Sequence, residues 1–172
     1  MFLKTEGINL KTINYSESSQ ILIIFSKEHG KMSLLAKGVK KSSRSYKGKL
    51  QTFMHNQYLI SKKTSMGIIS QIDSIHPFLD LPKDYDKLSI AYQCIDLIHR
   101  IIQENHPYPD LFDIVLNTLI KIESTEITQD NKVLKNFKKQ LLQHEGMLNE
   151  NSQDHHIELM LNQYIGKTKV VL

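Results

Sequence analysis

Hydrophobic and polar side chains alternate in short runs along the first 80 residues of the chain. The alternation is clearest over residues 2–14, and a wholly apolar run at 21–25 follows a polar turn at 15–19. A period of two is typical of strands with one buried face. Short apolar runs that contain β-branched residues and lie between turns are typical of central strands. Three further strands are predicted at 32–36, 50–60 and 68–78.

Five short strands separated by turn residues indicate a small antiparallel barrel. The leading candidate is a five-stranded oligonucleotide/oligosaccharide-binding (OB) barrel. This fold binds single strands with the face of its second and third strands and with nearby loops. The periodicity is also compatible with an SH3-like barrel, and the sequence pattern leaves this alternative open.

The apolar spacing changes after Pro77 and Pro82. Apolar residues then recur every three or four positions, which predicts helices near 84–102, 112–122, 129–143 and 157–165. Asp84 or Asp86 can cap the first helix, and the prolines at 107 and 109 end it. The predicted fold class is therefore α+β, with an OB-fold barrel (residues 1–79) followed by an all-α helical domain (residues 80–172).

Composition excludes several classes of protein. The chain has 172 residues, of which 40% are hydrophobic and 23% charged, as in ordinary globular domains. No apolar run approaches the roughly 20 residues that a membrane-spanning helix needs, and the first residues lack the charged-then-apolar order of a signal peptide. The single cysteine, Cys94, cannot form an internal disulfide or a thiolate zinc cluster. These features predict a cytoplasmic protein without membrane contact.

Positive charge is concentrated in the first half of the chain. Residues 1–80 hold 12 Lys and Arg against 5 Asp and Glu, whereas residues 81–172 hold 10 against 13. The richest stretch, 31–49, has no acidic residue, and the glycines and serines of its second half predict a loop. A flexible cationic loop beside strands can hold a polyanion backbone. A solvated surface loop is the alternative that composition leaves open.

Short motifs stand in order along the chain: TEGINLKT at 5–12, YSES at 15–18, HGK at 29–31, AKGVKK at 36–41 and LQTF at 50–53. Downstream follow AY at 91–92, ENHP at 104–107 and LF at 111–112. Their order and spacing resemble the RecO family of bacterial DNA repair proteins. The likeness covers about residues 4–146, is densest before residue 60, and rests on the series rather than on a single motif.

The resemblance implies a recombination mediator rather than an enzyme, working without a cofactor at the nucleoid. Such a protein binds single- and double-stranded DNA and anneals complementary strands. With RecR and the C-terminal tail of single-stranded-DNA-binding protein as partners, it helps to load the recombinase. The sequence itself shows no catalytic constellation of side chains. Two other functions stay open, a protein-interaction adaptor and an RNA-binding OB module.

One departure from the family concerns zinc. RecO proteins commonly carry a four-cysteine zinc module after the segment that matches Gly146, and this chain has no cysteine there. Residues 157–169 look like the family's final helix, so the resemblance implies a short form that lacks the module internally. His144, His155 and His156 do not replace the module, because a structural zinc needs four convergent ligands and these histidines lack helical i, i+4 pairing. No metal site is predicted.

The predicted DNA contacts are cations of the basic stretch and of neighbouring turns, since lysine and arginine neutralise phosphates at any sequence spacing. They are Lys11, Lys31, Lys37, Lys40, Lys41, Arg44, Lys47, Lys49, Lys62 and Lys63. Tyr46 is a candidate for stacking on a base, whereas Phe53 is expected in the core.

Overall fold

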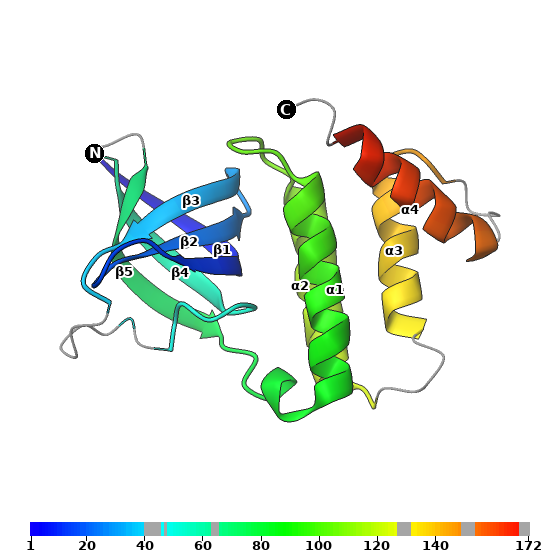
Figure 1. Cartoon of the computed structure of the whole chain (residues 1–172), viewed down its shortest axis with the longest axis horizontal. Helices are drawn as coiled ribbons and strands as arrows, with labels where there is room; N and C mark the ends of the chain where they lie inside the picture. Colours follow the sequence, from blue (N-terminus) through cyan, green and yellow to red (C-terminus); the bar gives the residue numbers. More distant parts are fainter. Residues whose placement is uncertain (40–45, 47, 63–65, 127–131, 149–153, 169–172) are drawn as a thin grey trace. The chain divides into compact units, whose positions relative to one another are not determined.

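The computed structural model of the chain describes residues 1–39, 46, 48–62, 66–126, 132–148 and 154–168. Within these ranges the chain forms five strands, one 3-10 helix and four α-helices (Figure 1). The residues divide into two compact units. The first consists of Met1–Leu79 and Ile102–Phe112, and the second of Asp80–Ile101 and Asp113–Leu172.

The strands of the first unit close into a barrel in the order β1-β2-β3-β5-β4. They are β1 (Phe2–Asn14), β2 (Gln20–Ser26), β3 (Gly30–Ala36), β4 (His55–Ser61) and β5 (Gly67–His76). β1 closes the barrel because its first half pairs with β4 and its second half with β2, and a bulge between Asn9 and Lys11 bends it near the point where the two ladders meet. A short parallel contact at Leu34 and Leu35 joins β3 to β5. The predicted OB-fold barrel is confirmed.

Inward side chains at alternate strand positions form the barrel core. Leu22 and Ile24 of β2 are fully buried, as are Leu34 and Ala36 of β3, while the residues between them are only half-buried. This burial pattern is the physical counterpart of the period-two pattern in the sequence. Phe53 is also buried, as expected.

The fourth strand is shorter than its sequence pattern suggests. The alternation predicts a strand from residue 50, but β4 begins at His55. Phe53 has a φ of 74°, which is incompatible with a pleated strand. The Phe53 amide donates to the Asn9 carbonyl at 2.9 Å, and the Asn9 amide donates to the Met54 carbonyl at 2.9 Å. Residues 50–54 therefore form a segment that precedes β4 and is hydrogen-bonded to β1 through Asn9.

The segment between the first two helices belongs to the barrel unit. The Lys31 amide donates to the Gln103 carbonyl at 3.3 Å, and the Asn105 amide donates to the Lys31 carbonyl at 3.1 Å. The segment thus lies parallel to the start of β3. Gly30 permits this approach, because a Cβ at residue 30 would lie 1.8 Å from the His106 carbonyl oxygen. The predicted domain division between residues 79 and 80 does not include this return of the chain to the barrel.

The helices make up the second unit, apart from the first turn of α2. They are α1 (Tyr85–Ile101), α2 (Pro109–Ser124), α3 (Lys132–His144) and α4 (Asp154–Thr168), preceded by the 3-10 helix η1 (Leu81–Lys83). Of the two predicted caps, Asp84 is the one used, since its Oδ1 accepts from the amides of Asp86 and Lys87. Residues 129–131, where the third helix was expected to begin, lie outside the described part.

Packing within the helical unit follows the apolar positions that the sequence pattern predicts. Leu134, Phe137 and Leu141 of α3 are buried, and the Lys138 ammonium pairs with Glu158 Oε1 of α4 at 2.5 Å. Cys94 of α1 is fully buried, and this burial raises the pKa of its thiol to about 12. Among the described helices, none is long and apolar enough to cross a membrane.

Candidate nucleic-acid interface

Half of the predicted DNA contacts lie in the described part of the chain. These are Lys11, Lys31, Lys37, Lys49 and Lys62. Lys40, Lys41, Arg44, Lys47 and Lys63 lie outside the described residues. All five described lysines belong to the barrel unit.

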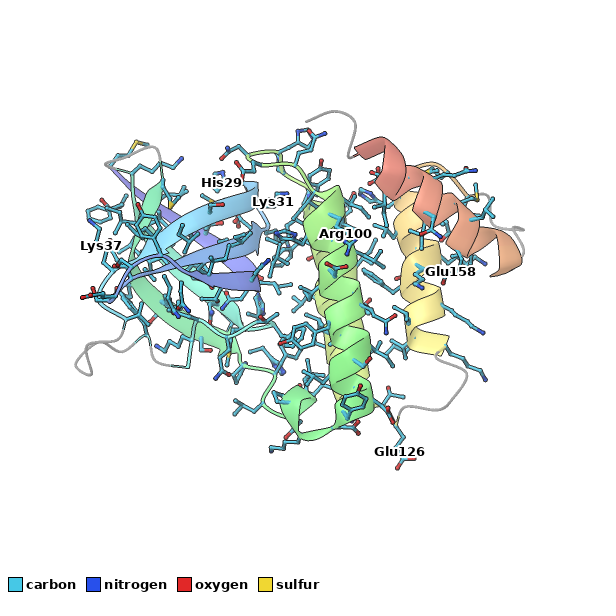
Figure 2. The ribbon with its side chains drawn as sticks, viewed as in Figure 1. His29, Lys31, Lys37, Arg100, Glu126 and Glu158 are labelled. Carbon is cyan, nitrogen blue, oxygen red and sulfur yellow. The ribbon has the colours of Figure 1, made fainter. Side chains whose placement is uncertain are left out.

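The described lysines do not form one cluster. Lys31 is at the start of β3 and Lys37 directly follows its end, so the two occupy opposite ends of the strand (Figure 2). Six residues of extended chain separate their Cα atoms by about 20 Å. Lys37 and Lys49 flank residues 40–45 and 47, which lie outside the described part and include Lys40, Lys41, Arg44 and Lys47. The structure therefore divides the predicted site into a group around the β3–β4 connection and a second group at Lys31 and Lys62.

Lys49 has a structural role in the barrel. Its ammonium donates to the Ile72 carbonyl of β5 at 2.8 Å, and its own carbonyl accepts from the side-chain amides of Asn9 at 2.9 Å and Asn56 at 3.0 Å. A half-buried ammonium that is hydrogen-bonded to a carbonyl contributes less to phosphate binding than an exposed ammonium. It must first give up the bond to the carbonyl before it can bond to the phosphate. Lys37, which is exposed, is the better placed of the two for a polyanion.

A buried polar network holds the C-terminal side of the β3–β4 connection. Asn9 of β1 also donates to the Gln51 carbonyl at 2.8 Å, and its Oδ1 accepts from the Tyr58 hydroxyl. Asn56 donates to the same hydroxyl at 3.0 Å. Tyr58 is fully buried, and this burial raises the pKa of its hydroxyl. The network links β1 and β4 to the backbone of residues 49–51.

Tyr46 lies in the barrel core rather than on the surface. Its side chain is 6% exposed and belongs to the same apolar cluster as Leu22 and Leu34. Its hydroxyl donates to the Ser70 carbonyl at 2.6 Å. A buried ring with its hydroxyl bonded offers no face to a base, so the stacking role predicted for Tyr46 does not fit this structure. Tyr46 instead anchors the connection from within.

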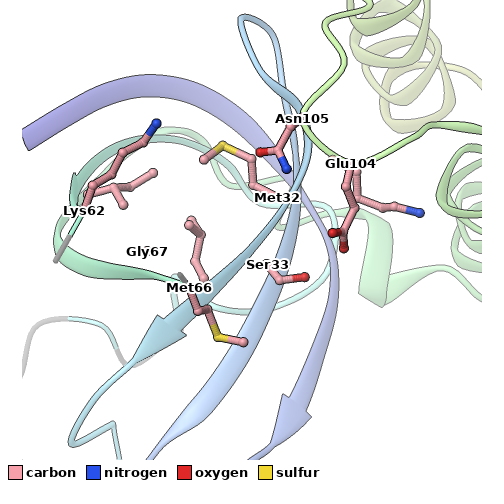
Figure 3. Close-up of a pocket in the computed structure, with 10 residues that line it drawn as sticks. Met32, Ser33, Lys62, Met66, Gly67, Glu104 and Asn105 are labelled. Atoms are coloured by element: carbon pink, nitrogen blue, oxygen red, sulfur yellow. The ribbon is translucent and has the colours of Figure 1, made fainter. Parts of the chain in front are cut away.

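A pocket of about 420 Å³ opens beside the first half of β3, where β5 does not pair with it. Figure 3 shows Lys62 and Met66 on one side of this pocket and Glu104 and Asn105 on the other. Lys31 also lines it. The Glu104 carboxylate offsets part of the positive charge of the lysines, and phosphates avoid such a carboxylate. The pocket is thus a weaker candidate for a phosphate backbone than the end of the barrel around Lys37.

His55 does not add a cation to this surface. Its imidazole is 5% exposed and its Nε2 lies 2.7 Å from Glu6 Oε1. Burial lowers the pKa of His55, and the hydrogen bond to Glu6 opposes this effect. Both groups thus contribute to the barrel and not to phosphate binding. In the described part of the chain, no three His, Cys, Asp or Glu side chains are grouped as metal ligands would be.

Comparison with known proteins decides the family. The family described as "Recombination protein O N terminal" matches residues 1–78, and "Recombination protein O C terminal" matches residues 82–147. The chain belongs to the RecO family. A DNA repair protein RecO from Acetivibrio thermocellus is 32% identical over 125 residues, which are 73% of this chain and 50% of that protein. The RecO of Bacillus subtilis is 30% identical over 119 residues, which are 69% of this chain and 47% of that protein.

A third RecO relative, from Alkaliphilus metalliredigens, is 27% identical over 147 residues, covering 86% of this chain and 59% of that protein. The chain spans about half the length of the curated RecO proteins it matches. The N-terminal RecO match ends just after the last strand of the barrel, and the C-terminal match covers the first three helices.

Two features of this RecO barrel were not predicted from the sequence pattern: the polar network of Asn9 and Asn56, and the pocket beside β3. The asparagines of the polar network left a signal, since Asn9 stands between Ile8 and Leu10 inside a strand and Asn56 stands two residues before Tyr58. An amide at a buried strand position requires partners, and here the partners are backbone carbonyls of a loop. The pocket left no local signal, because Glu104 and Asn105 reach it from a part of the chain that reads as the end of a helix.

Proposed function

We propose that this RecO family protein binds single- and double-stranded DNA with its barrel unit and anneals complementary strands. It acts with RecR to load the recombinase onto DNA covered by single-stranded-DNA-binding protein, in the cytoplasm at the nucleoid. The proposal rests on the match of the N-terminal and C-terminal RecO families to residues 1–78 and 82–147. The proposed activity is non-enzymatic, since it consists of binding and pairing DNA strands and no covalent bond is made or broken.

The distribution of charge supports a DNA contact on the barrel. Residues 1–80 contain 12 Lys and Arg but only 5 Asp and Glu, so the excess positive charge of the chain lies in the part that forms the barrel. Phosphate contacts release condensed counterions and supply most of the affinity of a non-specific DNA-binding protein. Lys37 is exposed at the point where the basic connection begins, and Lys11 is exposed on β1 close to where that connection returns at residues 49–51.

The salt dependence of binding to a short single-stranded oligonucleotide tests this contact. Engagement of about five phosphates gives a log–log slope near −3.5. The triple substitution Lys40→Ala, Lys41→Ala and Arg44→Ala removes three of the predicted cations. We expect the slope to become shallower by about 2, measured by fluorescence anisotropy at several salt concentrations.

A matched control removes the same charge elsewhere. Lys121, Lys132 and Lys135 are exposed lysines of the helical unit, and their replacement by Ala changes the net charge of the chain by the same amount. We expect this variant to keep the wild-type slope. An equal change in both variants would mean that net charge, and not the basic connection, determines binding, and an unchanged slope in the first variant would exclude the connection as the contact.

Annealing separates the proposed mediator from a simple binding module. Complementary oligonucleotides should anneal faster with the protein than without it, and the rate should change again when RecR is added. A protein that binds these strands without accelerating annealing would act as a binding adaptor. Tighter binding to an RNA strand than to a DNA strand of the same sequence would indicate an RNA-binding module instead.

A further inference from the structure

The pocket beside β3 reaches the core of the barrel. Within the described part of the chain, β3 meets β5 only at Leu34 and Leu35 and meets residues 103–105 only at its start. The pocket opens between these two contacts. Met32, Leu34 and Ile60 line it, and all three belong to the buried core cluster of the barrel. The pocket therefore has an apolar floor, and all the residues that line it belong to the barrel unit.

The size of the pocket suits a small molecule with a flat ring. Its volume of about 420 Å³ lies within the range of about 300–1,000 Å³ that is typical of small-molecule sites. Met66 lines the pocket together with Met32, so two thioethers are present. Thioether sulfurs make favourable contacts with aromatic rings. An aromatic ring on this floor would contact apolar side chains that the barrel core already holds in place.

The rim of the pocket carries opposite charges on opposite walls. Figure 3 shows Glu104 and Asn105 on one wall and Lys62 on the other, and all three residues are exposed. A carboxylate accepts hydrogen bonds through two oxygens, an amide both donates and accepts, and an ammonium only donates. A ligand that satisfies both walls presents N–H donors at one end and an anionic group at the other. A phosphate alone satisfies only the wall of Lys62.

Guanine has the edge that the wall of Glu104 requires. Its N1–H and its N2 amino group are adjacent donors, which match the two oxygens of one carboxylate, and its O6 accepts from an amide. Adenine places the acceptor N1 beside its N6 amino group, so one carboxylate oxygen would face a lone pair. The chemistry of this wall thus favours guanine over adenine, and the opposite wall supplies a cation for a phosphate.

We propose that the pocket beside β3 binds a guanine mononucleotide. Glu104 accepts from N1 and N2 of the base, Asn105 donates to O6, and Lys62 contacts the phosphate. The ring lies against the thioethers of Met32 and Met66. The inference goes beyond the proposed function, because it assigns a small-molecule ligand to a site that is separate from the basic β3–β4 connection.

A nucleotide in this pocket would join two segments of the barrel unit. Lys62 and Met66 come from the connection between β4 and β5, whereas Glu104 and Asn105 come from the segment that returns to β3. That segment is held by the bonds of the Lys31 amide and carbonyl to Gln103 and Asn105. Bound nucleotide should therefore slow hydrogen exchange at the amides of Lys31 and Asn105.

The test measures the affinity of the full chain for guanosine monophosphate (GMP) by isothermal titration calorimetry. We expect GMP to bind at least about tenfold more tightly than adenosine monophosphate, the discrimination typical of a bidentate contact to a base. Glu104→Gln should weaken GMP by a similar factor. It should strengthen xanthosine monophosphate, whose O2 replaces the amino group and accepts from the new amide. Lys62→Ala should weaken GMP and leave guanosine, which has no phosphate, unchanged.

Matched controls make the same changes at exposed positions of the barrel unit. Glu17→Gln and Lys4→Ala remove one charge each at residues that do not line the pocket, and both should bind GMP as the wild type does. An exchange of preference between two nucleotides in Glu104→Gln cannot come from partial unfolding, which would weaken both.

Three results would overturn the inference: no binding of GMP to the wild type, equal binding of GMP and adenosine monophosphate, or no effect of Glu104→Gln. A single strand containing guanine that binds through Glu104 when GMP does not would also overturn it, since the pocket would then bind a base within DNA. DNA binding is measured on the same samples. DNA binding without GMP binding removes only this inference, and GMP binding without DNA binding removes only the proposed function.

Discussion

Two asparagine side chains, Asn9 and Asn56, explain why the long β3–β4 connection ends where it does. Their amides donate to the carbonyls of Lys49 and Gln51 over 2.8–3.0 Å, and the Tyr58 hydroxyl completes the group. Buried amides of this kind stabilise only when all partners are present. A loop backbone held in this way keeps its position on the barrel even though its neighbours in sequence are mainly lysine, serine and glycine.

Removal of the Tyr58 hydroxyl should destabilise the barrel. Tyr58→Phe keeps the ring in the core but leaves Asn9 Oδ1 without the donor it has in the wild type. We expect a loss of about 1–3 kcal/mol in the free energy of unfolding, the cost of an unsatisfied buried polar group. Urea unfolding measures it. Tyr15→Phe makes the same chemical change at a 63% exposed site of the same unit and should stay within about 0.5 kcal/mol of wild type. Equal midpoints for the two variants would contradict the network.

Charge alone could not distinguish the lysines of the basic stretch. Lys37 and Lys49 read alike in the sequence, since both stand beside a glycine in a run of cations. Only the fold shows that the Lys49 ammonium caps a carbonyl of β5 while Lys37 extends from an exposed position. The same limit applies to aromatic residues. Tyr46 was chosen for its basic neighbours, and burial makes it a core residue, whereas Tyr15 has the exposed ring.

Among the elements, β3 shows most clearly how local and distant pairing differ. Its period-two pattern predicts the strand and its buried face correctly, because alternation is a property of the strand itself. Its neighbours are not local. β2 pairs with all of it, β5 meets it only at Leu34 and Leu35, and residues 103–105 bridge its start. The pairings with β5 and with residues 103–105 join residues more than 30 and 70 positions apart, and periodicity carries no information on such partners.

Gly30 couples β3 to this distant segment, and Gly30→Ala should separate the two. The residue has a φ of +69°, and a Cβ would lie 1.8 Å from the His106 carbonyl oxygen. Left-handed backbone costs a non-glycine residue about 1–2 kcal/mol, and the clash with backbone adds to this cost. We expect a larger loss of stability than strain alone explains. We also expect faster hydrogen exchange at the Lys31 and Asn105 amides, which bond across this contact.

Gly48→Ala is the control that distinguishes the cost of the left-handed backbone from the cost of the clash with His106. Gly48 also has a left-handed φ, +91°, but a Cβ there would meet no atom within 4 Å. The variant should lose only the strain contribution and should leave exchange at Lys31 and Asn105 as in the wild type. If both variants lose the same stability and exchange at the same rates, the close approach of residue 30 to residue 106 does not stabilise the barrel.

For the whole molecule, the sequence supports the class of fold and the sign of the charge on each half. Both come from short-range patterns, the change from period two to helical spacing near Pro77 and the excess of cations before residue 80. The return of residues 102–112 to the barrel unit is not such a pattern. In sequence these residues are a helix end, a proline-rich turn and a helix start. Their place is decided by contacts with β3 and with the rings of Phe25 and His55.

Because the barrel unit consists of residues 1–79 and 102–112, we expect a barrel fragment that ends at residue 79 to be incomplete. Phe112 packs edge-on against Phe25 at 5.4 Å and lies near His55 at 6.0 Å between ring centroids, with the Lys27 ammonium 5.7 Å from its ring. A fragment of residues 1–79 should therefore melt below a second fragment in which a Gly/Ser linker, as long as the segment it replaces, joins residues 1–79 to 102–112. We expect several degrees of difference, because about 1 kcal/mol shifts the Tm of a domain of this size by about 4–8 °C.

Phe112→Ala in the longer fragment supplies the control for this last comparison. A buried phenylalanine contributes about 3–5 kcal/mol relative to alanine, so the substituted fragment should lose most of the gain while keeping the linker, the length and the charge. Thermal unfolding followed by far-UV circular dichroism gives the three midpoints. If the two fragments without a substitution melt together, residues 102–112 contribute nothing to the barrel. If the substituted fragment melts as high as the unsubstituted longer fragment, the linker rather than the rings is responsible. The expected order, with the longer fragment highest, would make residues 102–112 part of the barrel that is proposed to bind DNA.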